Sequence, residues 1–355
     1  MLTISLLTLG DPGQLTGGYL YHRRMAEVAS DHDAQLLFSS FPMYPFPLPA
    51  LRASAVLHEA QASGAGVLVI DSIAAAYLAP WLAAHRLPLP LAASVHQSPG
   101  GIDHGQLRTP VQAHLDRAVY RRAGRLLVAS DALAEALVAA GFPDRQVRVV
   151  APGRDVAAAP EPIRPRDLRE GRRAALLCVG NWVPRKGILD LLEAVAALPP
   201  ETAVLHLVGD DTADAAYASR VRARLSRSDL AGRVRVHGPV TKERVAAFYR
   251  DTDMFVLPSL REPYGTVYGE AMAAGLPVVG WRAGNLPHLA THGREGLILA
   301  PGDTEGLSRA LERLATDDAY RHRLAAAAAQ RAQTFPTWAQ TAERFFGELR
   351  EVASR

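Results

Sequence analysis

Residues 262–279, with the sequence EPYGTVYGEAMAAGLPVV, say more about the fold than any other stretch of the chain. The first carboxylate, Glu262, lies in a loop after the apolar run 254–257, and the second, Glu270, lies just inside a predicted helix. A helix that begins near Gly265 directs unpaired N–H groups and the positive end of its dipole toward that loop, which makes a seat for phosphate. With a carboxylate on each side to accept hydrogen bonds from hydroxyls, the segment suits a sugar nucleotide. Taken singly, each glutamate could equally have a structural role.

Short apolar, β-rich runs alternate with helical patterns along the whole chain, which predicts parallel sheets built from βαβ units. A proline-rich stretch over residues 156–173 separates two halves. We therefore predict two Rossmann-like doubly wound domains, residues 1–155 and 174–333, and a closing helix within residues 334–355. Ligands of open α/β sheets bind at the carboxyl ends of the strands, so a ligand shared by both domains belongs in a cleft between them. The expected strands are 3–9, 35–38, 67–70, 89–95, 126–129, 147–150, 174–179, 204–208, 234–237, 254–257, 278–280 and 297–299, and the expected helices include 19–30, 51–62, 75–85, 111–122, 132–140, 189–197, 215–225 and 242–249.

The composition limits the class of protein. The chain has 355 residues, 48% of them hydrophobic, and a net charge of +3, so it can bury a large core but is not a polycation built for nucleic acid. No apolar run approaches the roughly 20 residues that span a bilayer, and the first ten residues have the pattern of a strand, not of a signal peptide. The single cysteine, Cys178, lies in an apolar run and is expected to be a buried hydrophobe. We expect a cytoplasmic protein.

The segment that begins at Glu262 resembles the signature of the family-4 retaining glycosyltransferases, in which a glutamate, seven residues and a second glutamate precede Ala-Met-Ala-x-Gly-x-Pro-Val-Val. This resemblance implies the GT-B fold, with two Rossmann-like domains facing a central cleft and a C-terminal helix that crosses back to the N-terminal domain. It also implies transfer of a hexose-type sugar from a nucleoside-diphosphate sugar to an acceptor, with retention of configuration, by front-face displacement. No metal or other cofactor is expected.

The resemblance assigns roles to residues of the C-terminal domain. Glu270 is expected to accept hydrogen bonds from the ribose hydroxyls, and Glu262 to orient the transferred sugar. Residues near Val240 are expected to border the base. The diphosphate is expected to bind the first turn of the helix together with two cations, so that the remaining donor-binding residues are Tyr264, Gly265, Thr266, Val267, Arg185 and Lys186.

The two cations lie in a segment that resembles the family's strand–Gly-Arg…Lys-Gly element, residues 179–187. Lys186 matches the family's lysine, which neutralises the leaving diphosphate. Stabilising the charge that develops on a leaving group contributes strongly to catalysis in a site without water. Asn181 stands where the family has an arginine. Either Arg185 supplies the missing charge from a shifted position, or donor affinity rests mainly on Lys186.

Three residues of the N-terminal domain complete the predicted site. Gly17 and Gly18 follow the first strand, where glycines let a backbone approach a diphosphate, although an isolated pair could be a plain loop. His96 ends a predicted strand, and the family places a histidine that meets the donor sugar at such a position. We therefore expect His96, Glu262 and Lys186 to be the catalytic residues.

The acceptor is not specified by the sequence, and a small molecule, a glycan or a lipid-linked molecule are all open. The loop 39–49 is rich in proline and aromatic residues and could form an apolar lip or pack against its neighbours. His104 is ambiguous and could belong to an acceptor loop. The basic clusters 22–24 and 121–122 could touch an anionic membrane, but at +3 overall they are expected to be solvated faces.

Several features leave alternatives open. Asp251 and Asp253 spell the Asp-x-Asp motif of metal-dependent transferases, but they precede a buried strand, and we expect no metal there. Asp210 and Asp211 suit a base- or ribose-binding role or a helix cap. Asn285 and His288 depart from the family's Gly-Gly-x-Pro-Glu pattern and leave the role of their loop undecided. A sugar-nucleotide epimerase and a non-catalytic two-lobed sugar-binding protein are the alternative functions.

Overall fold

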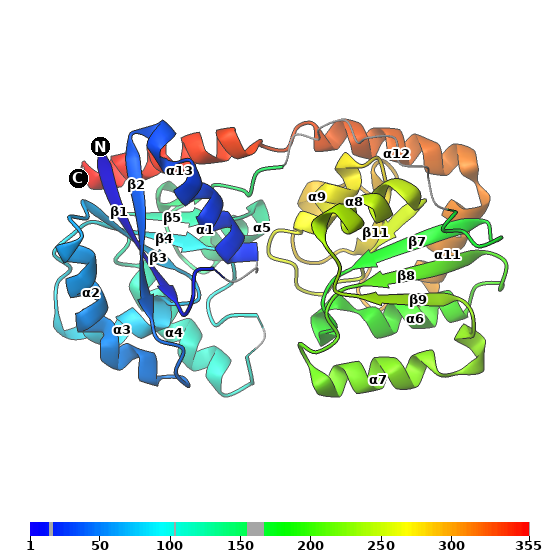
Figure 1. The fold of residues 1–355 in the computed structure, drawn as a ribbon, viewed down its shortest axis with the longest axis horizontal. Coiled ribbons are helices and arrows are strands. Elements are labelled where there is room, and N and C mark those ends of the chain that lie inside the picture. Colours follow the sequence, from blue (N-terminus) through cyan, green and yellow to red (C-terminus); the bar gives the residue numbers. More distant parts are fainter. Residues whose placement is uncertain (14–16, 103, 155–166, 355) are drawn as a thin grey trace. The chain divides into compact units, whose positions relative to one another are not determined.

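The computed structural model describes residues 1–13, 17–102, 104–154 and 167–354. The chain divides into two compact units, of which one is Met1–Asp155 together with Pro336–Arg355 and the other is Val156–Phe335. Each unit is a parallel sheet with helices on both faces (Figure 1). Residues 156–166 of the predicted linker lie outside the described residues.

The sheet of the first unit has the strand order β2-β1-β3-β4-β5-β6, and every pair is parallel. All residues of β3, β4 and β5 are buried, because helices cover both faces of the sheet. From β1 the chain adds β2 on one side and then β3 on the other, so the strand order changes direction at β1. Polar residues gather at the carboxyl ends of the neighbouring strands, which is the edge where open α/β sheets bind ligands. The strands are β1 (Leu2–Leu9), β2 (Ala34–Phe41), β3 (Val67–Asp71), β4 (Leu91–Val95), β5 (Arg125–Val128) and β6 (Val147–Val149).

One helix of the first unit comes from the far end of the chain. Helix α13 (Trp338–Ala353) begins with a capping box between Thr337 and Gln340 and lies along the same unit as α1 (Figure 1). Its Phe345 and Phe346 are fully buried in the core that covers one face of the sheet. The other helices of this unit are α1 (Gly17–Glu27), α2 (Ala53–Ala62), α3 (Ala75–Ala84), α4 (Arg108–Tyr120) and α5 (Asp131–Ala139), with short 3₁₀ helices η1 (Ala29–His32), η2 (Leu48–Arg52) and η3 (Asp144–Gln146).

The sheet of the second unit has the order β12-β11-β10-β7-β8-β9, again parallel throughout. Its strands are β7 (Ala174–Val179), β8 (Ala203–Val208), β9 (Val234–Gly238), β10 (Met254–Val256), β11 (Val278–Trp281) and β12 (Gly296–Leu299). Cys178 on β7 is buried, and burial raises the pKa of its thiol to about 12. The helices are α6 (Ile188–Ala196), α7 (Ala215–Leu225), α8 (Lys242–Asp251), α9 (Thr266–Ala273), α10 (Leu286–Leu289), α11 (Thr304–Thr316) and α12 (Asp318–Ala332), with η4 (Pro184–Lys186) and η5 (Ser228–Leu230).

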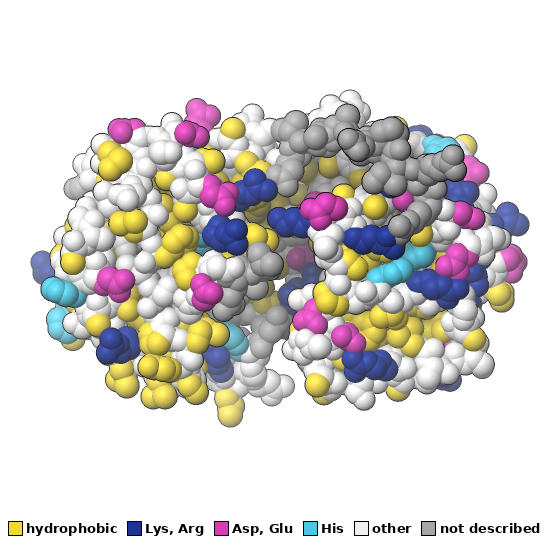
Figure 2. Space-filling model, in the orientation of Figure 1, with side chains coloured by type: hydrophobic (Ala, Val, Ile, Leu, Met, Phe, Trp, Pro, Cys, Tyr) yellow, Lys and Arg dark blue, Asp and Glu magenta, His cyan; other side chains and the backbone are white. Residues whose placement is uncertain are grey.

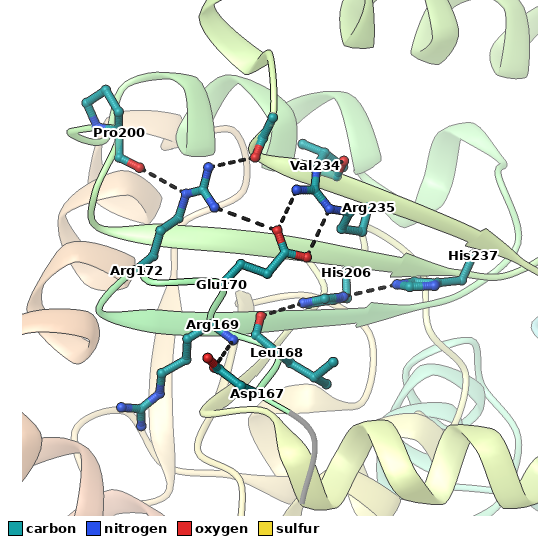
Figure 3. A network of polar contacts seen from close by, with 11 residues as sticks. Asp167, Leu168, Arg169, Glu170, Arg172, Pro200, His206, Val234, Arg235 and His237 are labelled. Atoms are coloured by element: carbon teal, nitrogen blue, oxygen red, sulfur yellow. Dashed lines mark hydrogen bonds and ion pairs between the residues drawn. The ribbon is translucent and has the colours of Figure 1, made fainter.

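Residues 167–172 are held against β8 and the edge strand β9 of the second unit (Figure 3). Glu170 pairs with Arg235 on β9, and the Leu168 carbonyl accepts a hydrogen bond from His206 Nε2 at 2.9 Å. Because a carbonyl only accepts, His206 carries its proton on Nε2, and its Nδ1 must accept from His237 Nε2, 3.0 Å away. These contacts of residues 168 and 170 fix the path by which the chain enters β7.

Candidate functional site

The carboxyl ends of β7 and β10 in the second unit bring a lysine and a glutamate into direct contact. Lys186 ends η4, just after β7, and its Nζ lies 2.5 Å from Glu262 Oε2. The Arg185 guanidinium approaches the same oxygen at 3.8 Å, and Ser259 Oγ lies 3.4 Å from it. The Lys186 and Glu262 side chains are only 10% and 13% exposed. Two cations and one carboxylate therefore form a compact cluster, which we call the Glu262 cluster.

The loop that carries the cations is fixed by close packing of backbone against backbone. Gly187 has φ 67°, and a Cβ there would lie 2.1 Å from the Pro258 carbonyl oxygen, so only glycine fits. The amide of Leu260 donates to the Arg185 carbonyl at 2.7 Å. Asn181, which replaces the family's arginine, is exposed and its Oδ1 accepts from the Asp210 amide at 3.4 Å.

Helix α9 begins beside this cluster. Gly265 precedes it in the left-handed conformation, with φ 86°, and a Cβ there would lie 2.9 Å from Tyr268 Cδ2. Within the described residues, the N–H groups of Gly265, Thr266 and Val267 donate no hydrogen bond. The start of α9 therefore offers N–H groups and the positive end of the helix dipole next to the Glu262 loop.

The second glutamate of the motif has a buried partner. Glu270 Oε2 accepts a hydrogen bond from Tyr249 Oη at 3.0 Å, and Tyr249 is only 4% exposed. Burial, followed by the nearby Glu270 carboxylate, raises the pKa of Tyr249 far above its ordinary value, so the hydroxyl keeps its proton and donates. Glu270 itself is exposed on α9.

The departure from the family pattern at Asn285 has a structural explanation. Asn285 is 2% exposed, its amide N–H donates to the Glu262 carbonyl at 3.0 Å, and its side chain donates to the Tyr264 carbonyl at 2.8 Å. A Cβ on Gly284 would lie 2.7 Å from both the amide nitrogen and the carbonyl oxygen of Glu262. The Gly284–Asn285 pair therefore clamps the loop that carries Glu262.

The remaining acidic candidates have protein partners. Asp253 binds Arg169 and accepts from the Ala175 amide at 2.8 Å, and Asp251 pairs with Arg250. Asp210 accepts from the amide and hydroxyl of Thr212 at 2.8 and 2.7 Å, and Asp211 pairs with Arg222. Val240 is half-buried in the loop before α8.

In the first unit, polar side chains gather at the carboxyl ends of β1, β3 and β4. His96 follows β4 and is half-buried, and its backbone amide donates to Ser72 Oγ at 3.2 Å. Gly17 and Gly18 open α1, and a Cβ on Gly18 would lie 4.0 Å from His96 Cδ2. The structure thus brings Gly18 and His96 close together.

His22 corrects one prediction. We expected residues 22–24 to form a solvated basic face, but His22 is 0% exposed, on the side of α1 that faces the sheet. It contacts His96, Ser94 and Asp71. Of these three residues, the sequence pointed only to His96. Burial lowers the pKa of His22 to about 3, so the ring is neutral and its 3.4 Å contact with Asp71 is not an ion pair.

A pocket of about 490 Å³ lies at the carboxyl ends of β1 and β2. It has both apolar and charged walls, and its lining residues include Phe41, Pro42, Tyr44, Arg52 and Glu59. The loop 39–49 therefore both packs inward, through the fully buried Phe41, and borders a pocket.

Hydrophobic side chains gather on the surface of the first unit, at the end where α3 and α4 lie (Figure 2). Among the described helices, none is long and apolar enough to cross a membrane. The exposed apolar residues of this end are Met43, Tyr44, Leu48, Leu51, Leu107 and Val111.

Solved structures share this architecture. Sucrose-phosphate synthase from Thermosynechococcus elongatus matches with a TM-score of 0.83 and 21% identity over 100% of both chains. HepE from Anabaena, solved in complex with UDP and glucose, matches with a TM-score of 0.80 and 21% identity over 99% of this chain and 100% of that one. Two parallel six-stranded α/β units with these neighbours define the GT-B class of fold.

Sequence comparison identifies the family. Residues 4–153 match the glycosyl transferase 4-like domain, and residues 173–317 match glycosyl transferases group 1. The chain belongs to glycosyltransferase family 4. A D-inositol 3-phosphate glycosyltransferase from Streptomyces avermitilis is 31% identical over 280 residues, which are 72% of this chain and 59% of that protein. The lipopolysaccharide core biosynthesis glycosyltransferase LpsE from Rhizobium meliloti is 36% identical over 152 residues, 42% of each chain. The chain spans about half to three fifths of the length of the first curated relatives it matches.

Proposed function

We propose that this protein is a retaining glycosyltransferase that moves a hexose-type sugar from a nucleoside-diphosphate sugar to an acceptor in the cytoplasm. The observation that carries the proposal is the Glu262 cluster at the start of α9, where Lys186 and Arg185 lie beside unpartnered N–H groups. The relative HepE was solved with UDP-glucose, which supports a donor of this class.

Each part of the second unit has a role in this proposal. The N–H groups of the first turn of α9 bind the diphosphate, and Lys186 and Arg185 neutralise it. Glu262 accepts hydrogen bonds from the hydroxyls of the transferred sugar, and Glu270, held by Tyr249, accepts from the ribose. Residues Tyr264 and Val240 border the nucleotide, and Gly17, Gly18 and His96 serve the substrates from the first unit.

The proposed chemistry is a front-face displacement. The bond from the anomeric carbon to the diphosphate oxygen breaks as the bond to the acceptor oxygen forms on the same face. The acceptor's proton passes to the departing diphosphate, so atoms and charge balance without an added base. Cations and helix N–H groups stabilise the charge on the leaving group in place of a metal.

For the acceptor we propose the pocket beside Tyr44, Arg52 and Glu59. Arg52 and Glu59 can bind the polar groups of a small molecule or glycan. The exposed apolar side chains at the α3–α4 end suit a lipid-linked acceptor, or a peripheral contact with a membrane, and vesicle co-sedimentation tests that contact.

The donor assignment is tested with nucleotide sugars and two variants. UDP-glucose and other nucleotide sugars are screened for thermal stabilisation, since a ligand at 100 times its Kd adds about 2.7 kcal/mol. Lys186→Met and Glu262→Gln are expected to lower turnover by orders of magnitude. Lys242→Met changes the only other lysine, which is exposed, and is the matched control. Full turnover in both site variants contradicts the proposal, as does activity that is lost in a metal chelator.

A further inference from the structure

A buried polar network lies behind His96 in the first unit. His96 Nε2 is 3.2 Å from His22 Nε2 and 3.0 Å from Ser94 Oγ, and Ser94 Oγ is 3.1 Å from His22 Nε2. These three atoms form a closed triangle. On the far side of the His22 ring, Nδ1 is buried without a hydrogen bond in the described part of the chain, and Asp71 Oδ2 lies 3.4 Å from it.

Asp71, which is 2% exposed, determines which atoms of this network donate hydrogen bonds and which accept them. Its carboxylate has three donors around it: Thr8 Oγ1 at 3.1 Å, Ser72 Oγ at 3.2 Å and the Ile73 amide at 3.3 Å. Burial raises the pKa of Asp71, and the hydrogen bonds from these three donors oppose that rise by stabilising the carboxylate, so we infer that the group accepts from its neighbours. A lone pair on His22 Nδ1 would face a carboxylate oxygen and be repelled, so Nδ1 carries the proton of the neutral His22 ring.

The proton on His22 Nδ1 decides the tautomer of His96. His22 Nε2 then holds a lone pair and must accept. If His96 Nε2 also held a lone pair, two lone pairs would face each other at 3.2 Å, and the one hydroxyl proton of Ser94 could satisfy only one of them. With the proton on His96 Nε2, every atom of the triangle has a donor or an acceptor.

This leaves His96 Nδ1 as the acceptor of the ring. It makes no hydrogen bond to any residue that the structure describes, and the His96 residue is half-buried. We propose that Asp71 and His22 are positioning residues that fix His96 as the Nε2–H tautomer, so that His96 Nδ1 accepts a hydrogen bond from a substrate hydroxyl. The substrate contact rests on the proposed function, whereas the tautomer does not.

Protonation of the two histidine rings does not disturb this arrangement of hydrogen bonds. Burial lowers the pKa of His22 and of His96 to about 3, and each ring is therefore neutral near pH 7. A neutral imidazole has one donor nitrogen and one acceptor nitrogen, so its tautomer decides whether it binds a hydroxyl as donor or acceptor.

The first test is the imidazole ¹⁵N NMR spectrum of the unliganded wild-type protein. The His96 signals are assigned as those that disappear in His96→Gln. The expected result is the Nε2–H tautomer for His96 and the Nδ1–H tautomer for His22. A wild-type His96 that carries its proton on Nδ1 overturns the proposal.

Asp71→Asn provides the second test, because it should reverse the direction of the hydrogen bonds from residue 71 through His22 to His96. The Ile73 amide holds the oxygen of the new side chain at the Oδ1 position, which places the amide NH₂ toward His22 Nδ1. His22 then moves its proton to Nε2, and His96 moves its proton to Nδ1. An unchanged His96 tautomer in a folded Asp71→Asn variant overturns the role of Asp71 and His22.

Turnover separates this inference from the proposed function. Asp71→Asn and His96→Gln are expected to lower kcat/KM by about 10–100-fold, the value of one or two hydrogen bonds. Ser63→Ala, which removes a hydroxyl that donates to the Ala60 carbonyl at the end of α2, should leave turnover unchanged. If Lys186→Met is inactive while Asp71→Asn is fully active, the substrate contact of His96 is refuted. If Lys186→Met and Glu262→Gln are both fully active, the proposed function fails instead.

Discussion

Replacing Gly284 with alanine should displace Glu262, and Gly293 offers a matched control. Both glycines lie in the second unit with positive φ, 56° and 79°, so alanine costs about 1–2 kcal/mol of backbone strain at either position. A Cβ on Gly293 meets nothing within 4 Å, whereas a Cβ on Gly284 lies 2.7 Å from the nitrogen and the oxygen of Glu262. The difference between the two variants therefore reports the contact with Glu262.

The size of that difference follows from the contact. A carbon at 2.7 Å is several tenths of an ångström inside ordinary van der Waals distance, and such overpacking costs about 1–3 kcal/mol. Moving Glu262 also stretches the 3.0 Å hydrogen bond from the Asn285 amide, worth about 1 kcal/mol. We expect Gly284→Ala to lose about 2–4 kcal/mol more than Gly293→Ala. Turnover should fall about 10-fold or more, since a shift of about 1 Å can cost about 100-fold.

Denaturant unfolding followed by tryptophan fluorescence measures this difference. Trp182 and Trp281 are buried in the second unit, and replacing Trp81 and Trp338 with phenylalanine confines the signal to that unit. Equal losses of stability and turnover in the two glycine variants would show that the contact with Glu262 has no energetic weight, and would refute the reasoning.

Three further changes test other contacts. Tyr249→Phe removes the hydrogen bond to Glu270 and should cost about 1 kcal/mol of stability and weaken nucleotide-sugar binding about fivefold, measured by calorimetry; unchanged affinity contradicts it. Thr341→Val removes the hydrogen bond to the Ala151 carbonyl and should lower the free energy of unfolding of the first unit by about 1 kcal/mol, while donor binding stays the same. Burial raises the pKa of Asp116 to about 7, so the folded state keeps a proton that the unfolded chain loses near pH 4. Stability of the first unit should therefore fall as the pH rises from about 4 to about 7, and Asp116→Asn should flatten this slope; an equal slope in the variant rejects the assignment.

The alternation of apolar runs and helical patterns was sufficient to predict the strands. All twelve expected strands are present, and their ends differ by at most three residues from those observed. Buried parallel strands such as β7 and β8 are uninterrupted apolar runs, so their signal is local. Helices α11 and α12 were not predicted, although α11 carries a clear apolar stripe that includes Leu307, Leu311 and Leu314.

The site was predictable only where its residues are close in sequence. Lys186 and Glu262 were each found from a short motif, but their contact joins loops 76 residues apart. Tyr249 and Glu270 meet across β10, and no local pattern marks that pair. His22 was missed for a different reason.

A signal for His22 did exist. Tyr21, Met25 and Ala29 repeat at helical spacing, which places His22 on the buried face beside them. The adjacent Arg23 and Arg24 directed attention to charge instead. Asp71 also had a signal, because it is the polar residue that ends the buried run of β3, at the edge where such sheets bind ligands.

Helix α13 has a consequence for biosynthesis. The first unit takes Phe345, Phe346 and Leu349 into its core, yet these are translated after the whole of the second unit. At about 5–20 residues per second, about 10–40 s separate residue 155 from residue 353. During that interval the first unit exposes the apolar face that α13 later covers, while the second unit can already close. The order of synthesis is therefore opposite to the order in which the two cores are completed.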